Sequence, residues 1–184
     1  MDRSAGVPAG RLLAQIEESD LVGLIRRYGE ERGARRIARS VCRARDAGEL
    51  NSTADLTRAI EATKPQMLNK TLARVFQALR IAVNDELVEL ENGLDAAIEL
   101  LRPGGRLAVI SYHSLEDRIV KQKLAQLVKG CVCPPALPAC ACGLLPSFRA
   151  VSRRQSATPV EVEANPRARS AALRLYEKLD QEAL

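Results

Sequence analysis

Four polar side chains follow directly on a short apolar segment of the chain: Ser111, His113, Ser114 and Asp117. Their hydroxyl, imidazole and carboxylate groups can fix a polar ligand or take part in proton transfer. Open α/β sheets bind ligands at the carboxyl ends of their strands, where these groups would lie. The spacing therefore predicts one edge of an active site. A helix start capped by Ser114, with Glu116 in its first turn, explains the same pattern, and both roles are compatible.

Four of the five cysteines lie within twelve residues: Cys131, Cys133, Cys140 and Cys142. Four thiolates form the ligand set of a tetrahedral structural zinc site, and the prolines between them restrict the loop. This spacing predicts a zinc clip in a Cys/Pro loop, residues 130–146, of a protein in a reducing compartment. A reduced, metal-free loop and a redox-sensitive loop are the alternatives. Cys42 lies on an apolar helical face and is expected in the core.

Three groups of polar and basic side chains can meet an anionic partner. One group lies loosely along one helical face: Arg74, Gln77, Arg80 and Asn84. It can grip RNA phosphates or bases, or it can form a polar stripe that packs against a helical insertion. A second group lies near the end of the sequence: Asn165, Arg167 and Arg169. The third lies away from the apolar stripe of its helix and can bind phosphates or remain solvated: Arg32, Arg35, Arg36, Arg39 and Arg43.

Helices must position most of these groups. Apolar periodicity predicts helices over residues 20–28 and 34–42, and Ser52 followed by Asp55 predicts a capped helix that ends before Pro65. A long helical pattern then runs from residue 76 to residue 101, where Pro103-Gly104-Gly105 stops it. Asn92-Gly93 is the expected position of any kink or break in it.

The pattern changes after Gly105. Residues 107–110 form a short apolar run, as expected of a strand buried on both faces. A helix over residues 115–128 and a strand over residues 148–151 should follow. Residues 171–176 are expected to form a terminal strand, although their composition suits a helix equally well. Helices, strands and loops thus alternate in the second half, which predicts an α/β protein.

Composition excludes several classes of protein. The 184 residues include 46% hydrophobic residues, which is enough for a packed core, and 28 Lys and Arg stand against 23 Asp and Glu. That formal charge of +5 is compatible with an anionic partner, nucleic acid first, although net charge alone slightly favours a solvated, salt-bridged surface. No stretch approaches the ~20 apolar residues of a membrane span, and the first residues lack a signal pattern. We expect a cytoplasmic protein with no membrane partner.

Five blocks occur along the chain in a fixed order: Tyr28-Gly29-Glu30-Glu31-Arg32, Arg36-Ile37-Ala38-Arg39, FQALRIAVNDEL at 76–87, SYHSLEDRIVK at 111–121 and NPRARS at 165–170. In this combination they closely resemble the RsmH (MraW) family of small-subunit rRNA cytosine-N(4) methyltransferases. The resemblance covers nearly the whole chain.

The resemblance implies part of a class I S-adenosylmethionine-dependent, Rossmann-like methyltransferase domain with a helical insertion. Residues 1–70 would be part of the insertion, and residues 71–184 would be the C-terminal half of the catalytic domain. The implied activity is methylation of a 16S rRNA cytidine, with the small ribosomal subunit as partner. Ser111, His113, Ser114 and Asp117 would then face the target base. Both polar groups, at residues 74–84 and 165–169, would contact RNA.

The cofactor loop of the family has no counterpart in this sequence. None of the eleven glycines forms a Gly-x-Gly pair, so no cradle for S-adenosylmethionine is assigned. The chain therefore resembles a truncated enzyme that is expected to be inactive alone. One alternative is a non-catalytic, zinc-clipped RNA- or ribosome-binding module derived from such an enzyme. Another is a marginally folded fragment with an exposed sheet edge.

Overall fold

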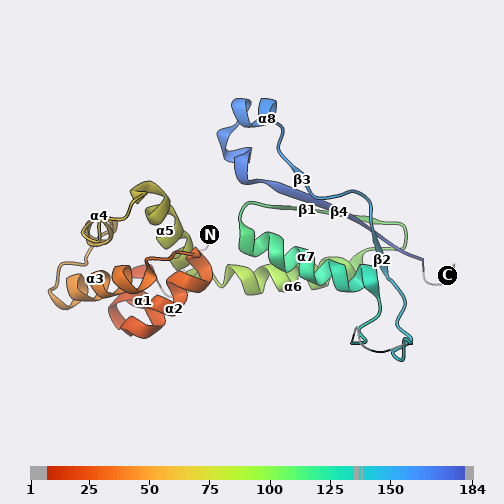
Figure 1. Cartoon of the computed structure of the whole chain (residues 1–184), viewed down its shortest axis with the longest axis horizontal. Helices are drawn as coiled ribbons and strands as arrows, with labels where there is room; N and C mark the ends of the chain where they lie inside the picture. Colours follow the sequence, from red (N-terminus) through yellow and green to blue (C-terminus); the bar gives the residue numbers. More distant parts are fainter. Residues whose placement is uncertain (1–7, 135–136, 138, 181–184) are drawn as a thin grey trace. The chain divides into compact units, whose positions relative to one another are not determined.

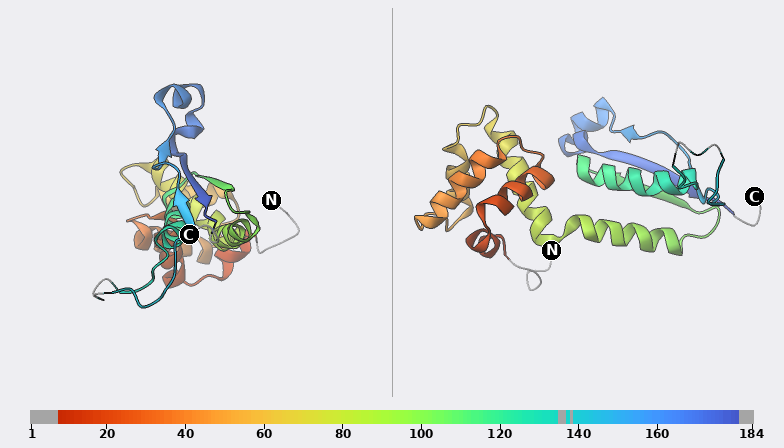
Figure 2. Two further views of the ribbon diagram at one scale, coloured as in Figure 1. Left: turned by 90° about the vertical axis from the view of Figure 1, so that its right-hand side faces the viewer. Right: turned by 60° about the horizontal axis from the view of Figure 1, so that its bottom comes forward.

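A computed structural model describes residues 8–134, 137 and 139–180 (Figure 1, Figure 2). Contacts between Cα atoms divide the chain into two compact units, Met1–Glu86 and Leu87–Leu184. Each unit has its own apolar core. Within the described residues, no helix has both the length and the apolar character needed to cross a membrane.

The first unit is built from helices: α1 (Ala9–Gln15), α2 (Glu18–Gly29), α3 (Ala34–Asp46), α4 (Thr53–Glu61) and α5 (Leu68–Asn84). Apolar residues at helical spacing form its core, among them Ile25 of α2, Ile37 of α3 and Val75 of α5, each no more than 1% exposed. The predictions for α2 and α3 are confirmed. The Ser52 cap is also confirmed, because its side chain accepts a hydrogen bond from the Asp55 amide. Nothing in the sequence pattern had indicated α1.

A buried glutamate joins three parts of this helical unit. Glu31 is 7% exposed and lies in the turn between α2 and α3. Its Oε1 accepts the Gly33 amide at 2.9 Å, and its Oε2 accepts from Arg74 Nη1 at 3.2 Å and from Thr71 Oγ1 at 3.4 Å. Glu31 thus ties the turn before α3 to α5.

The long helix expected over residues 76–101 is in fact two helices. The break lies at Asp85, which has a left-handed backbone with φ of 48°, and α6 (Glu86–Leu100) begins at the next residue. Asp tolerates this conformation better than most residues. Arg80 and Asn84 both donate to the Glu86 carboxylate, which stabilises the junction. The expected break at Asn92-Gly93 is therefore wrong, since both residues lie inside α6.

The second unit contains α6, a sheet and further helical segments. Its remaining elements are β1 (Arg106–Ser111), α7 (Ser114–Lys129), β2 (Phe148–Ala150), β3 (Gln155–Ser156), α8 (Pro159–Ala164), the 3-10 helix Pro166–Ser170 and β4 (Ala172–Lys178). All described strand pairs are antiparallel, in the order β1-β4-β2, and β3 also pairs with β4. The structure is therefore mixed α/β, and the terminal segment is a strand. The predictions for β1, α7 and β2 are also confirmed.

Helices α6 and α7 cover one face of this sheet (Figure 1). Leu107 and Tyr176 of the sheet pack there with Leu94 of α6 and Leu124 of α7. On the opposite face, Ile110 is 58% exposed and lines an open hollow together with Gln155 of β3 and Glu161 of α8. The prediction that this strand is buried on both faces is therefore wrong for the described residues.

Candidate functional site

The polar residues that follow β1 lie at the start of α7, as their spacing predicted. Ser111 is buried, and its hydroxyl lies 3.4 Å from the Ala172 carbonyl of β4, to which it donates. The helix cap is not Ser114, as expected, but His113, one residue earlier. His113 Nδ1 accepts the Glu116 amide at 3.3 Å, and Glu116 Oε2 accepts the His113 amide at 3.2 Å. A reciprocal capping box therefore fixes the imidazole.

The capping box also sets the charge of Glu116. Burial raises the pKa of Glu116, whereas the His113 ring and the backbone amides of Tyr112 and His113 lower it. The lowering is the larger effect, so the pKa lies below its ordinary value. Since His113 Nδ1 is an acceptor, the neutral ring carries its proton on Nε2. This buried nitrogen lies 3.2 Å from Glu116 Oε1 without the geometry of a hydrogen bond. His113 Nε2 is thus a buried side-chain nitrogen without a hydrogen-bond partner among the described residues.

Asp117, one turn into α7, is held by arginines. Arg174 Nε donates to Oδ1 at 2.7 Å and Nη2 donates to Oδ2 at 3.0 Å, while Arg154 Nε lies 3.4 Å from Oδ2. The hydrogen bonds from Arg174 lower the pKa of Asp117, and burial opposes them only in part. A carboxylate with a lowered pKa is a weak proton acceptor at neutral pH. Asp117 therefore positions the start of α7 on β4.

The polar stripe on α5 makes contacts within its own unit. Arg74 binds Glu31, and Gln77 Nε2 donates to the Tyr28 carbonyl at 3.3 Å. Arg80 forms an ion pair with Glu86, and Asn84 donates to the Arg80 carbonyl at 2.8 Å. Although Arg74 and Arg80 are about half exposed, these contacts join the stripe to other residues of the helical unit. RNA contact stays a prediction.

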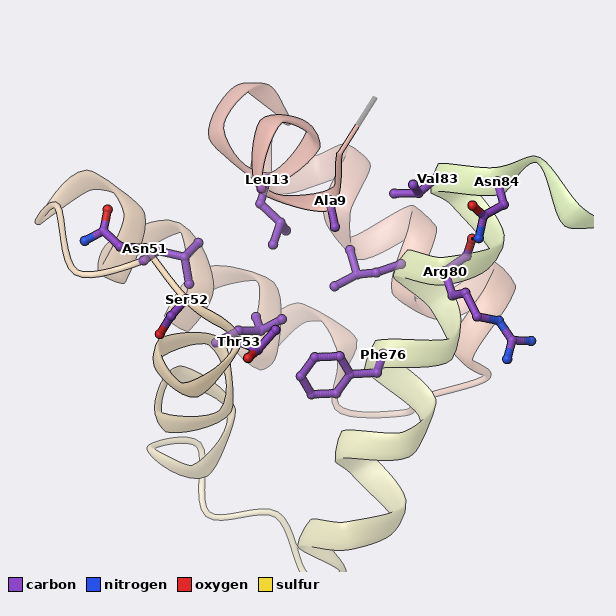
Figure 3. Close-up of a pocket in the computed structure, with 13 residues that line it drawn as sticks. Ala9, Leu13, Asn51, Ser52, Thr53, Phe76, Arg80, Val83 and Asn84 are labelled. Carbon is purple, nitrogen blue, oxygen red and sulfur yellow. The ribbon is translucent and has the colours of Figure 1, made fainter. Parts of the chain in front are cut away.

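Arg80 and Asn84 also lie at the rim of a pocket between α1, α4 and α5 (Figure 3). The pocket has a volume of about 480 Å³, and its floor is apolar, with Leu13, Leu79 and Phe76 among its lining residues. The size is in the range of small-molecule sites.

The second polar group lies on the 3-10 helix before β4. Asn165 caps this helix, because its Oδ1 accepts the Arg167 amide at 3.2 Å. The side chains of Arg167 and Arg169 are exposed, and Ala168 between them is buried. Ala168 thus anchors a turn that presents two guanidinium groups to solvent.

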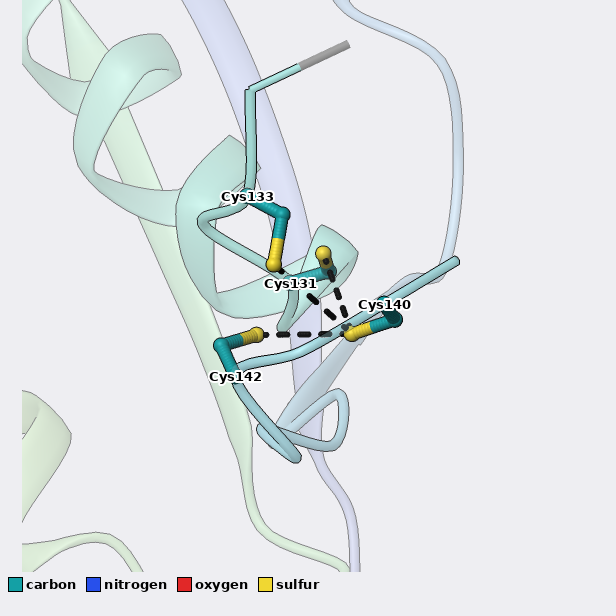
Figure 4. Close-up of side chains that lie close together, drawn as sticks. All are labelled: Cys131, Cys133, Cys140 and Cys142. Carbon is teal, nitrogen blue, oxygen red and sulfur yellow. Dashed lines mark hydrogen bonds between the residues drawn. The ribbon is translucent and has the colours of Figure 1, made fainter. Parts of the chain in front are cut away.

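The four clustered cysteines converge (Figure 4). Their sulfur atoms all lie within 4.8 Å of one another, and Cys140 Sγ is 3.5 Å from both Cys131 Sγ and Cys142 Sγ. Backbone amides of Leu144 and Val132 lower the pKa of Cys142 to about 6, which supplies one thiolate at neutral pH. Zn–S bonds of about 2.3 Å in a tetrahedron put sulfur atoms roughly 3.8 Å apart. The four thiols can therefore hold a metal ion.

Protein atoms fill the space beside three of the described glycines. A Cβ added at Gly29, Gly105 or Gly130 would meet protein atoms at 2.9 Å or less. The hollow beside β1 that Ile110 and Leu173 help to line has a volume of about 150 Å³, below the roughly 300 Å³ of a typical ligand pocket. This hollow is therefore too small for S-adenosylmethionine.

Sequence reasoning did not single out two important side chains, Glu31 and Arg174. Arg174 alternates with Leu173 and Leu175 in β4 and has a side chain only 14% exposed. An arginine on the buried face of a strand requires a carboxylate partner. This requirement could have predicted from the sequence that Arg174 pairs with a carboxylate such as Asp117. Glu31 gave no comparable signal, since its partners on α5 lie 40 or more residues away.

Comparison with known proteins gives a consistent result. The model of the MraW methylase family matches residues 1–179. A protein of Symbiobacterium thermophilum called ribosomal RNA small subunit methyltransferase H is 50% identical over 97% of this chain and 58% of its own length. Proteins of the same name from Citrifermentans bemidjiense and Geobacter sulfurreducens are 47% and 49% identical, over 97% and 93% of this chain and 59% and 57% of theirs. The chain thus spans less than two thirds of the length of these relatives.

Proposed function

Because the chain belongs to the MraW methylase family, we propose that it is part of an enzyme that methylates the N4 amine of a cytidine in 16S rRNA. The methyl donor would be S-adenosylmethionine, and the substrate would be the small ribosomal subunit or its rRNA. The family match over residues 1–179 carries this proposal. The names of the relatives, which specify rRNA of the small subunit, support it.

The contribution of this chain to the reaction would be to hold the target base. The amine of cytosine is a weak nucleophile because its lone pair is delocalised into the ring, so its orientation toward the methyl donor matters. Ser111, His113, Ser114 and Asp117 would form the edge that faces the extruded base. The fixed imidazole of His113 supports this role, whereas Asp117 would act through its contact with Arg174.

The second unit would be the C-terminal half of a Rossmann-like methyltransferase domain, and the helical unit would belong to an insertion in that domain. An α/β sheet covered by helices on one face supports this assignment. S-adenosylmethionine would bind mainly to parts of the enzyme outside these 184 residues, since the sequence contains no Gly-x-Gly motif of the kind that cradles such a cofactor. When bound, the cofactor supplies an electrophilic methyl group. The polar groups at residues 74–84 and 165–169 would contact RNA.

A chimeric enzyme tests this function. This chain would replace the matching stretch of the Symbiobacterium thermophilum relative, and the chimera would be incubated with small subunits that lack the methyl group. We expect incorporation of labelled methyl into rRNA and N4-methylcytidine on mass spectrometry of its nucleosides. The substitution His113→Asn retains a side chain that can cap α7. It should therefore lower the rate of methyl transfer by a larger factor than it lowers the equilibrium constant for folding.

The outcome also separates the enzyme from its non-catalytic alternative. A chimera that binds S-adenosylmethionine and small subunits but transfers no methyl group would contradict the proposal. That result would favour a zinc-clipped RNA- or ribosome-binding module, which the converging cysteines support. The unmodified relative serves as the positive control.

The cysteine cluster would be a structural zinc site. Four thiols at separations close to those of a tetrahedral Zn–S4 site support zinc over harder cations, which prefer oxygen. The site lies in the loop between α7 and β2, away from the polar edge at the start of α7. The metal would therefore stabilise the loop and take no part in methyl transfer.

Zinc content is a direct check of this site. The purified chain is expected to carry about one zinc ion, measured by elemental mass spectrometry after dialysis against a weak chelator. The double substitution Cys140→Ser/Cys142→Ser should abolish binding and make the loop sensitive to limited proteolysis. The buried Cys42, which lies outside the cluster, provides the control, because Cys42→Ala should retain the metal. Equal zinc content in both variants would contradict the assignment.

A further inference from the structure

The excess positive charge of the chain is confined to one short region. Residues 26–45 contain eight Arg and two Glu, a formal charge of +6. The rest of the chain holds 20 basic and 21 acidic side chains, a formal charge of −1. The positive charge is thus a property of the end of α2, the turn that follows it and α3.

The packing of α3 fixes the direction of these arginines. Arg35, Arg39 and Arg43 recur at spacings of four, and Arg36 lies on the same side of α3, while Arg32 lies in the turn just before the helix. The opposite side carries Ile37, Ala38 and Val41, which are at most 2% exposed in the core. Arg26 of α2 joins Arg35 and Arg39 around a shallow surface hollow. We call this surface the arginine face: Arg26, Arg32, Arg35, Arg36, Arg39 and Arg43.

Most of the arginine face is not neutralised by the protein. Arg39 lies 3.6 Å from Glu18, and both side chains are substantially exposed. No carboxylate of the described residues lies within 4.0 Å of Arg35, Arg36 or Arg43 in any ion pair of the structure. Arg45, by contrast, lies outside the face and donates to the Ile16 carbonyl at 2.6 Å, which fastens α1. The face therefore holds exposed guanidinium groups without an internal structural task.

We propose that the arginine face is an RNA-docking surface that binds successive phosphates of the rRNA backbone, a role that rests on the proposed function. A helix rises 1.5 Å per residue, so residues 35–43 extend over about 12 Å, enough for roughly three phosphates of one strand. Guanidinium groups bind phosphate oxygens in a bidentate way. Phosphate contacts orient a protein on RNA without reading its sequence. The face thus positions the substrate, while recognition of the base takes place elsewhere.

The salt dependence of RNA binding tests this surface. The full 184-residue chain would be titrated into a labelled transcript of small-subunit rRNA at about 50 to 200 mM salt. The variant Arg35→Gln/Arg36→Gln/Arg43→Gln should bind roughly 10- to 100-fold more weakly, with a slope of log K against log salt reduced by about two. Glutamine preserves helix propensity, so the thermal unfolding midpoint should not change.

A charge-matched control removes three exposed lysines at other sites. The variant Lys70→Gln/Lys121→Gln/Lys129→Gln should keep the wild-type slope, because it removes the same charge while leaving every residue of the arginine face in place. Bound transcript should also protect Arg35 and Arg36 from phenylglyoxal, with the modified peptides identified by mass spectrometry.

Three results would overturn the proposal: no RNA binding by the wild-type chain, equal loss in the arginine and lysine variants, or binding to anionic vesicles but not to the transcript. The methyl-transfer assay reads the proposed function separately. If the chimera is active but the arginine variant binds RNA normally, only the proposal for the arginine face is contradicted. If the chimera is inactive but the arginine variant binds RNA weakly, the proposed enzymatic function is contradicted and the RNA-docking surface is supported.

Discussion

Substitution of Glu31 by alanine is expected to lower the free energy of unfolding of the helical unit by about 2 kcal/mol. The substitution leaves the Gly33 amide, the buried Thr71 hydroxyl and the half-exposed Arg74 guanidinium without their shared acceptor. Urea denaturation followed by circular dichroism measures the loss. Glu61→Ala, at an exposed position at the end of α4, is the control and should change stability by less than about 0.5 kcal/mol.

The contribution of Glu31 should also depend on pH. Burial raises its pKa, but hydrogen bonds from Gly33, Arg74 and Thr71 outweigh burial and lower the pKa below its ordinary value of 4.5. A group with a lowered pKa in the folded state stabilises the fold fully above its unfolded pKa. This stabilisation is lost as the pH falls through the folded pKa. The wild type should therefore lose more stability below pH 4.5 than Glu31→Ala does, and parallel pH profiles would contradict the assignment.

A second large effect is expected at the base of the cysteine loop. Gly130 ends α7 with φ of 68°, and a Cβ there would lie 2.5 Å from Leu145 C and Pro146 N. Gly130→Ala would combine backbone strain with a clash between two backbone segments, at a cost of about 2 to 4 kcal/mol. Because Pro146 closes the loop, the variant should also bind zinc more weakly. Urea denaturation and zinc titration measure the two effects.

Gly143 in the same loop is a matched control. Its φ of 65° is nearly equal to that of Gly130, but a Cβ there would meet nothing within 4 Å. Gly143→Ala should therefore cost only the backbone strain, about 1 kcal/mol. Equal losses in the two alanine variants would mean that the close approach to Leu145 and Pro146 contributes nothing.

Local patterns allowed most elements of the fold to be predicted. The apolar stripes of α2 and α3, the Ser52 cap and the change of period after Gly105 each depend on residues a few positions apart. The break at Asp85 did not follow from these patterns, because apolar periodicity continues through it while side chains from α5 and Glu86 hold it. The exposure of one face of β1 was also not predicted, because the apolar residues at 108 and 110 do not show whether a helix covers them.

The candidate site was predictable in its residue types but not in its contacts. Convergence of the cysteines follows from their short spacing and is present in the structure. The choice of His113 over Ser114 as the cap depends on a one-residue difference in where α7 begins. The bidentate pair of Asp117 with Arg174 joins residues 57 positions apart, which no local pattern can specify.

The position of β4 in its sheet dictates the order of events during synthesis. β4 pairs with β1 on one side and with β2 and β3 on the other, although it is the last strand in the sequence. β1 ends at Ser111, whereas β4 ends at Lys178. At about 5–20 residues per second, the ribosome needs roughly 3 to 13 seconds to make the intervening segment. During that interval β1 has emerged without its pairing partner, so the nascent chain is most open to aggregation and chaperone binding between these two points.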